Sequence, residues 1–89
     1  MMKEILSKAS IVDVRTFSEF SEDHYPGAIN IPLNELSERL EEIKEMKKPN
    51  VAYCRSGARS GMAVSLLKQS GLNEVYNGGG LFDLYNLNA

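Results

Sequence analysis

The chain has 89 residues and a mass of 9.9 kDa, which suits one domain with a single modest core. Ten basic and twelve acidic side chains give a formal charge of −2, which argues against a nucleic acid or an anionic membrane as partner. One cysteine cannot close an internal disulfide, and with one histidine it cannot complete a structural zinc site. We therefore expect one domain over residues 1–89, with no metal and no cofactor.

The sequence predicts a cytoplasmic protein. Its first residues lack the apolar run of about seven or more residues that marks a signal peptide, and no segment approaches the roughly 20 apolar residues of a membrane span. An export signal that has been removed would leave no trace here, and in that case the compartment is the periplasm.

The first elements are predicted from β-branched runs, a capping box and a turn. Thr16 is the expected N-cap of a short helix, with Glu19 reaching back to complete the box. A Pro-Gly turn at residues 24–27 separates this helix from a strand that Pro32 ends. In chain order we predict a buried strand at 11–14, a helix ending near residue 22, and a strand at 28–31.

The next helix is predicted from Asn34 as its N-cap and from its periodic apolar side chains. Those side chains are Leu36, Leu40 and Ile43. The other face is acidic, and we interpret it as a solvated surface formed by Glu38, Glu41, Glu42 and Glu45. The sequence 47–49, Lys-Lys-Pro, ends this helix.

The C-terminal half predicts a strand, a helix and a last short strand. A strand at 50–53 leads into Cys54, and a last strand at 74–76 precedes three glycines. We interpret these glycines as a tight turn, which could also form the wall of a pocket. The intervening helix ends at Gly71 and places its apolar side chains in the core: Met62, Ala63, Leu66 and Leu67. Strands that alternate with helices indicate an α/β fold with a small, mainly parallel β-sheet flanked by helices.

The loop after Cys54 carries the strongest chemical signal. It places Cys54 at the carboxyl end of a strand and before a helix N-terminus, where ligands bind and backbone N–H groups converge. Gly57 and Ala58 are small enough for the backbone to curl around the sulfur, and Arg55 and Arg59 favour a thiolate. The alternative is an inert buried cysteine, but such a residue is not usually followed by basic, small and polar neighbours.

The spacing of this loop argues against a phosphatase or an arsenate reductase. Cysteine phosphatases separate their cysteine and arginine by five residues, whereas Arg59 follows Cys54 after only four. The shorter ring suits one sulfur atom better than a phosphate. Tyr53 also stands where those phosphatases carry histidine, and the loop offers no carboxylic acid as a proton donor.

Three motifs in order resemble the rhodanese (thiosulfate sulfurtransferase) family, over roughly residues 11–84. They are Ile-Val-Asp-Val-Arg at 11–15 with Glu-Phe at 19–20 and the segment 24–32, then Cys-Arg-Ser-Gly-Ala-Arg-Ser at 54–60, and Val-Tyr-Asn-Gly-Gly-Gly at 75–80. The resemblance implies a short, single-domain rhodanese-like fold whose active-site loop lies between a strand and a helix.

The resemblance also implies a reaction. Cys54 would be catalytic, taking a sulfane sulfur from thiosulfate or a related anionic donor, carrying it as a persulfide, and passing it to a thiol or cyanide acceptor. The loop that binds substrate and persulfide would be Arg55, Ser56, Gly57, Ala58, Arg59 and Ser60. We expect Arg55 to recruit the donor and Arg59 to brace the loop against a carboxylate. The alternative is a sulfur-relay module that works with a partner protein.

Asp13 and Arg15 belong to the same resemblance, and we expect supporting roles for them. Asp13 would anchor the loop by accepting hydrogen bonds, and Arg15 would pair with Glu19 or another carboxylate. We expect a structural role for His24, in the turn. Leu81 stands where the family often has tryptophan, as in the short phage-shock-type sulfurtransferases, which are usually exported; this similarity counts against the cytoplasmic prediction.

Overall fold

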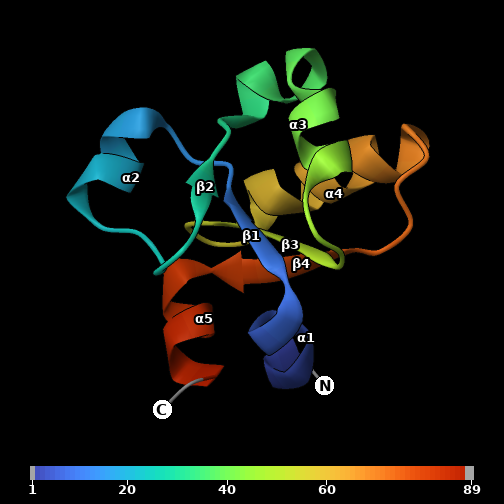
Figure 1. Ribbon diagram of the computed structural model, residues 1–89. Coiled ribbons are helices and arrows are strands. Elements are labelled where there is room, and N and C mark those ends of the chain that lie inside the picture. The colour runs from blue at the N-terminus through green and yellow to red at the C-terminus, as the bar shows by residue number, and fades with distance from the viewer. Residues whose placement is uncertain (1, 88–89) are drawn as a thin grey trace.

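A computed structural model describes residues 2–87 and shows a four-stranded, all-parallel sheet (Figure 1). The strand order is β2-β1-β3-β4. The strands are β1 (Ser10–Asp13), β2 (Ile29–Asn30), β3 (Asn50–Cys54) and β4 (Val75–Gly80). The expected α/β fold with a mainly parallel sheet is confirmed.

Helices cover both faces of the sheet (Figure 1). They are α1 (Met2–Lys8), α2 (Phe17–Glu22), the 3-10 helix η1 (Leu33–Glu38), α3 (Leu40–Glu45), α4 (Ala58–Gln69) and α5 (Leu81–Leu87). Side chains alternate between the two faces along each strand, so β3 contributes to two hydrophobic clusters. Ala52 and Cys54 pack with η1, α3 and α4, whereas Val51 and Tyr53 pack with α1 and α5.

The capping box of α2 is confirmed. The Thr16 hydroxyl oxygen accepts from the Glu19 N–H at 3.2 Å, and the Glu19 carboxylate accepts from the Thr16 N–H at 3.1 Å. This box starts the helix with a local pattern that needs no tertiary contact.

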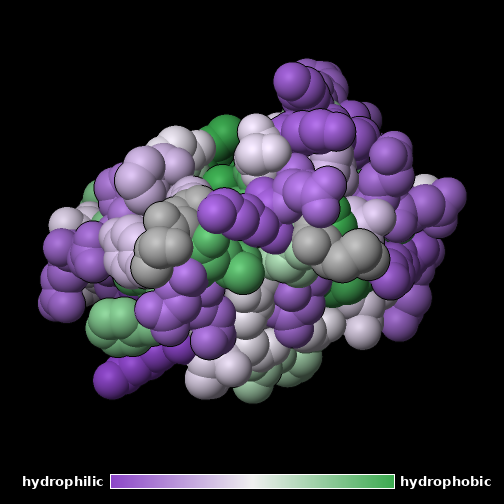
Figure 2. Space-filling model, turned by 90° about the horizontal axis from the view of Figure 1, so that it is seen from below, coloured by the Kyte–Doolittle hydropathy of each residue, from purple (hydrophilic) through white to green (hydrophobic). Residues whose placement is uncertain are grey.

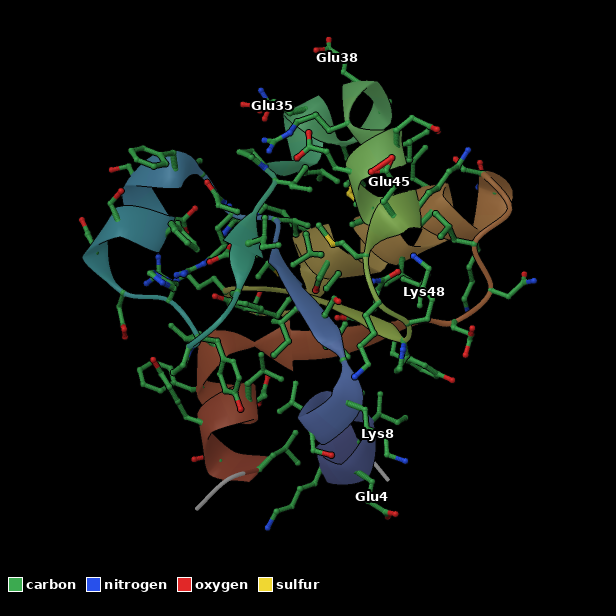
Figure 3. The ribbon with its side chains drawn as sticks, viewed as in Figure 1. Glu4, Lys8, Glu35, Glu38, Glu45 and Lys48 are labelled. Carbon is green, nitrogen blue, oxygen red and sulfur yellow. The ribbon has the colours of Figure 1, made fainter. Side chains whose placement is uncertain are left out.

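The predicted single helix starting at Asn34 is wrong. The chain forms η1, whose N-cap is Pro32 with no side-chain cap bond, and then restarts as α3 after a break at Arg39. Leu36 and Ile43 are both fully buried. The spacing of seven that places both side chains on one face of a continuous α-helix thus stays compatible with burial when the chain changes from a 3-10 turn to an α-helix between them. The acidic face is exposed as expected, and Glu35 and Glu38 project away from the sheet (Figure 3).

Met62 is not a core residue, contrary to the prediction, because 64% of it is exposed. Ala63 and Leu67 are the buried side chains of α4. They lie four positions apart and share one face, whereas Met62 is rotated from Ala63 by about 100° around the helix. The glycines after Asn77 are likewise not a tight turn but the end of β4, with a positive φ only at Gly79.

Helices α1 and α5 have no counterpart in the sequence prediction. Both pack on the face of the sheet that holds Tyr53, where Leu6, Leu81 and Leu84 are buried. Viewed from this end, the surface is largely hydrophilic with small hydrophobic patches (Figure 2). Within residues 2–87, no helix is long and apolar enough to cross a membrane.

Candidate active site

The loop at Cys54 is shaped by a glycine in a left-handed conformation. Cys54 ends β3, and Gly57, with φ of 100°, precedes the first residue of α4. Residues with a side chain rarely adopt this φ, so glycine permits the sharp return of the backbone. The turn brings the amino end of α4 against the sulfur.

The Cys54 sulfur lies among hydrogen-bond donors of its own loop. Sγ accepts from the Gly57 N–H at 3.0 Å and from the Ser60 N–H at 3.4 Å, and the Ser60 hydroxyl lies 3.4 Å away. Only 1% of the cysteine is exposed. The arrangement is a nest of N–H groups suited to hold a negatively charged sulfur.

Two opposing effects set the acidity of this thiol. Burial raises the pKa of Cys54, because it disfavours the charged form. Hydrogen bonds oppose it: the Ser60 hydroxyl, when its proton points to the sulfur, and the N–H groups of Ser60, Gly57 and Ser56 lower the same pKa. The hydrogen bonds prevail, so the pKa lies below its ordinary value and a thiolate forms more readily.

The glycines of β4 form the wall behind the loop. Gly80 is in register with Cys54, and a Cβ on Gly80 would overlap the carbonyl oxygen of Arg55. A Cβ on Gly57 would lie at an ordinary 3.4 Å from the Gly79 Cα, so Gly57 is required by its positive φ and not by lack of space. The Arg55 carbonyl therefore approaches Gly80 more closely than a side chain at position 80 would allow.

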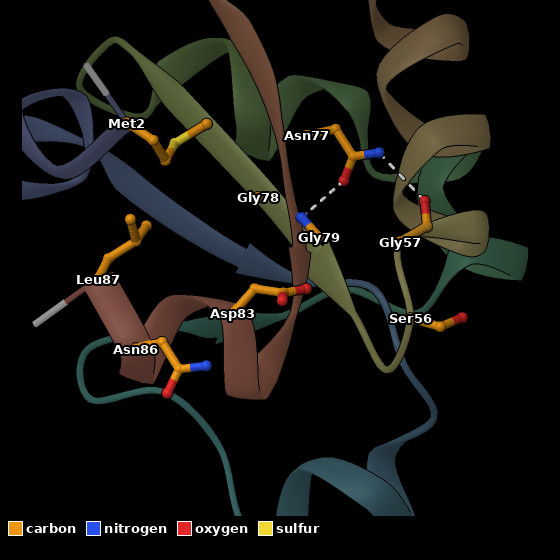
Figure 4. A pocket seen from close by; sticks show the side chains of 9 residues that line it. All are labelled: Met2, Ser56, Gly57, Asn77, Gly78, Gly79, Asp83, Asn86 and Leu87. Carbon is orange, nitrogen blue, oxygen red and sulfur yellow. Dashed lines mark hydrogen bonds between the residues drawn. The ribbon is translucent and has the colours of Figure 1, made fainter. Parts of the chain in front are cut away.

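Asn77 joins β4 to the loop (Figure 4). Its Nδ2 donates to the Gly57 carbonyl at 3.1 Å, and its Oδ1 accepts from the Gly79 N–H at 2.9 Å and the Ser60 hydroxyl at 2.6 Å. Together with Ser56, Gly57 and residues of α5, it lines a cavity of about 580 Å³. Asn77 was not among the predicted site residues, since nothing in its local pattern marks it as a neighbour of the loop.

Arg59 is held by a carboxylate from α2. Its guanidinium donates to the two Glu19 oxygens at 2.8 and 3.0 Å. This side-chain hydrogen bond lowers the pKa of Glu19 to about 2 despite the opposing effect of burial. The pair ties the capping box of α2 to the start of α4, and it offsets the charge of Arg59 with that of Glu19.

Arg55 is exposed and points into a smaller pocket. In the part of the chain that the structure describes, its side chain forms no hydrogen bond or ion pair. The pocket has a volume of about 270 Å³ and is lined by Arg15, Glu19, Glu22, Asp23, Arg55, Leu81 and Phe82. Arg55 is thus the cation of the loop that is available to a ligand.

Asp13 and Arg15 form a buried pair with each other, and Arg15 does not pair with Glu19. The Arg15 guanidinium donates to Asp13 at 2.7 Å, and the hydroxyl of Tyr53 donates to the same carboxylate at 2.7 Å. Asp13 therefore holds Tyr53, the residue before Cys54, while no residue of the loop 55–60 donates to it within the described chain. Burial raises the pKa of the Tyr53 hydroxyl.

His24 belongs to the scaffold. Its Nδ1 lies 2.9 Å from the Phe20 carbonyl oxygen, and its ring stacks on the Phe20 ring at 3.8 Å between centroids. Across residues 2–87, no group of three or more histidine, cysteine or acidic side chains is placed to hold a metal ion.

Comparison with known proteins agrees with this geometry. YqhL of Bacillus subtilis is 44% identical over 70 residues, which make up 79% of this chain but only 55% of YqhL. The thiosulfate sulfurtransferase PspE of Escherichia coli is 40% identical over 74 residues, 82% of this chain and 71% of PspE. A solved structure of an E. coli rhodanese with anions has a TM-score of 0.77 and 37% identity, covering 84% of this chain and 89% of that one.

The family assignment rests on the extent of these matches. The rhodanese-like domain matches residues 1–86, which is nearly the whole chain. The fold, the three ordered motifs and the loop around the Cys54 sulfur all lie within the matched region. The chain belongs to the rhodanese-like domain family, which includes sulfurtransferases.

Proposed function

We propose that the chain is a sulfurtransferase that moves a sulfane sulfur from thiosulfate, or a related donor, to a thiophilic acceptor through a persulfide on Cys54. The observation that supports this most directly is the position of the Cys54 Sγ, which accepts hydrogen bonds from the N–H groups of Gly57 and Ser60 at 3.0 and 3.4 Å. These donors stabilise negative charge on sulfur, which is the charge that both half-reactions require.

In the first half-reaction the Cys54 thiolate attacks the outer sulfur of thiosulfate. A new S–S bond forms to Cys54, the S–S bond of thiosulfate breaks, and its electron pair leaves with sulfite. The product is a persulfide whose terminal sulfur carries the negative charge. The N–H groups of the loop 55–60 are the donors available to it, and Arg55 is the group we assign to recruiting the anionic donor.

In the second half-reaction an acceptor nucleophile attacks the terminal sulfur. With cyanide, a C–S bond forms, the S–S bond to Cys54 breaks, and thiocyanate leaves while Cys54 returns as the thiolate. A thiolate acceptor becomes a persulfide in the same way. Both leaving groups are stable anions, so neither step needs a general acid or base, and His24 has no role in the chemistry. The acceptor comes from outside, because the sequence has one cysteine.

Mass spectrometry of the intact protein tests the proposal. Incubation with thiosulfate should add the mass of one sulfur atom, and cyanide should remove it with release of an equimolar amount of thiocyanate. The variant Cys54→Ser should show neither change, while Met62→Leu, altered at an exposed position of α4, should behave as the wild type. A wild-type protein that forms neither persulfide nor thiocyanate would exclude this function.

A sulfur-relay module is the second candidate, and an exposed aromatic side chain favours it. Phe82 is 78% exposed and lines the same pocket as Arg55. Exposed aromatic side chains beside a reactive group are typical of surfaces that contact proteins. For a relay, turnover with free thiosulfate should be negligible, whereas a persulfidated donor protein should transfer its sulfur rapidly to Cys54. Efficient turnover with thiosulfate alone would favour the enzyme.

A further inference from the structure

The Ser60 hydroxyl has one proton and three acceptors within reach. Asn77 Oδ1 lies 2.6 Å from the hydroxyl oxygen, the Gly57 carbonyl oxygen 3.2 Å, and the Cys54 sulfur 3.4 Å. A hydroxyl donates one hydrogen bond at a time. Ser60 can therefore stabilise a thiolate at Cys54 only while its proton points to the sulfur.

The orientation of the Asn77 amide follows from its other two contacts. The Gly79 N–H faces Oδ1 at 2.9 Å, and the Gly57 carbonyl faces Nδ2 at 3.1 Å. Rotating the amide by half a turn would set two donors against each other at Gly79 and two acceptors at Gly57. An amide oxygen therefore faces Ser60, and because it can only accept, the serine hydroxyl is the donor in the 2.6 Å contact.

We propose that Asn77 is a positioning residue that keeps the Ser60 hydroxyl proton turned away from the Cys54 sulfur. The hydroxyl then presents its lone pairs to Sγ. Such an oxygen accepts a hydrogen bond from the neutral thiol and repels the thiolate. The backbone N–H groups of the loop alone stabilise the charged sulfur, and Asn77 limits how far the resting cysteine ionises.

The ionisable groups around the loop are the same in every variant, because the proposed substitutions do not change them. Arg59 of α4 is paired with Glu19 of α2, Asp13 is paired with Arg15 at the end of β1, and the Asp83 carboxylate of α5 accepts from the Gly80 N–H at 2.7 Å. The remaining ones are Arg55, which is exposed, and Tyr53, which donates to Asp13. Their effects cancel when variants are compared at the same pH.

The rate at which iodoacetamide alkylates Cys54, measured against pH, tests the proposal. Asn77→Ala leaves the Gly57 carbonyl and the thiolate as the acceptors for the Ser60 proton, and the charged sulfur is the stronger of the two. Alkylation near neutral pH should therefore become about threefold to tenfold faster, and the midpoint of the pH profile should fall. The same substitution in a Ser60→Ala background should have no such effect, because the hydroxyl is gone. The readout is alkylation, so this inference, which rests on Cys54 as the reacting thiol, can fail independently of sulfur transfer.

A purely structural role for Asn77 predicts the opposite result. Loosening the loop would weaken its N–H donors and slow alkylation in both backgrounds, and that outcome would overturn the proposal. Ser60→Ala alone supplies a second test should Asn77→Ala not fold. If Asn77 holds the proton, the Ser60→Ala variant loses an oxygen that accepts a hydrogen bond from the neutral thiol and repels the thiolate. The thiolate is then favoured, so alkylation accelerates. An unchanged or slower rate in Ser60→Ala contradicts the proposal.

Discussion

At the level of single residues, the lowered pKa of Cys54 follows from hydrogen bonds within its loop rather than from the arginines beside it. The N–H groups of Gly57 and Ser60 point at Sγ, whereas Arg59 is turned to Glu19. Arg55 is exposed and without an ion pair in the described chain. Arg59 thus holds α2 against the loop, whereas Arg55 remains accessible to an anion.

Arg55→Ala should raise KM for thiosulfate by about threefold to tenfold and lower kcat less, because an exposed cation attracts the donor before bond formation. Steady-state thiocyanate formation at low ionic strength measures both constants. Arg55→Lys should keep KM for thiosulfate close to the wild-type value. Lys68→Ala, which removes a charge near the far end of α4, should leave KM unaltered. A fall in kcat with KM unchanged would instead place Arg55 in the transition state.

At the level of elements, the carboxyl end of β4 determines the shape of the active-site loop. The glycines of this strand bring its backbone against residues 55–57. Gly80 faces the Arg55 carbonyl with no room for a side chain, and Asn77 holds the Gly57 carbonyl. Strand β4 therefore acts as a rigid support for the nest of N–H groups around the sulfur.

Gly80→Ala should misplace the loop and lower the rate of sulfur transfer by about a hundredfold, because its Cβ overlaps the Arg55 carbonyl oxygen. Gly61→Ala is the matched control: in α4, its Cβ would lie at an ordinary 3.4 Å from Asn77 Nδ2. The control should keep its activity and gain up to about 1 kcal/mol in the free energy of unfolding. Thiocyanate assays and urea unfolding measure the two effects, and wild-type activity in Gly80→Ala would refute this role of β4.

At the level of the whole molecule, stability comes from two hydrophobic clusters on opposite faces of one small sheet. The cluster beneath α3 and α4 contains Cys54, so the residue that we propose as the sulfur carrier is itself part of the core. The other cluster contains Tyr53 and is closed by α1 and α5. A domain of this size has a small margin of stability, so one cavity in either cluster has a large effect.

Leu67→Ala should lower the free energy of unfolding by about 2–5 kcal/mol, because the side chain is 1% exposed and packs in the cluster that holds Cys54. Met62→Ala, on the same helix but 64% exposed, should change it by less than about 0.5 kcal/mol. Urea unfolding followed by circular dichroism measures both variants. Equal effects of the two substitutions would show that α4 does not pack on the sheet through the face that holds Leu67.

Features that depend on neighbouring residues could be predicted from the sequence. The capping box at Thr16 and Glu19, the strands before Asp13 and Cys54, and the position of Cys54 before a helix were all predictable, because caps, β-branched runs and ordered motifs are local signals. The fold class followed from the alternation of strands and helices, which restricts the chain to a few layered architectures.

Features that depend on residues far apart in the sequence required the folded chain. The helix breaks at Arg39 although Leu36 and Ile43 on either side of the break are both buried. The Asp13 carboxylate, which pairs with Arg15, also accepts from the hydroxyl of Tyr53, 40 positions away. Asn77 reaches Ser60 across 17 positions only because β4 lies beside β3. Local sequence thus determines where the thiol of Cys54 sits in the fold, between a strand and a helix. The packing of distant strands and helices decides which donors surround it, because sheet register brings those groups together.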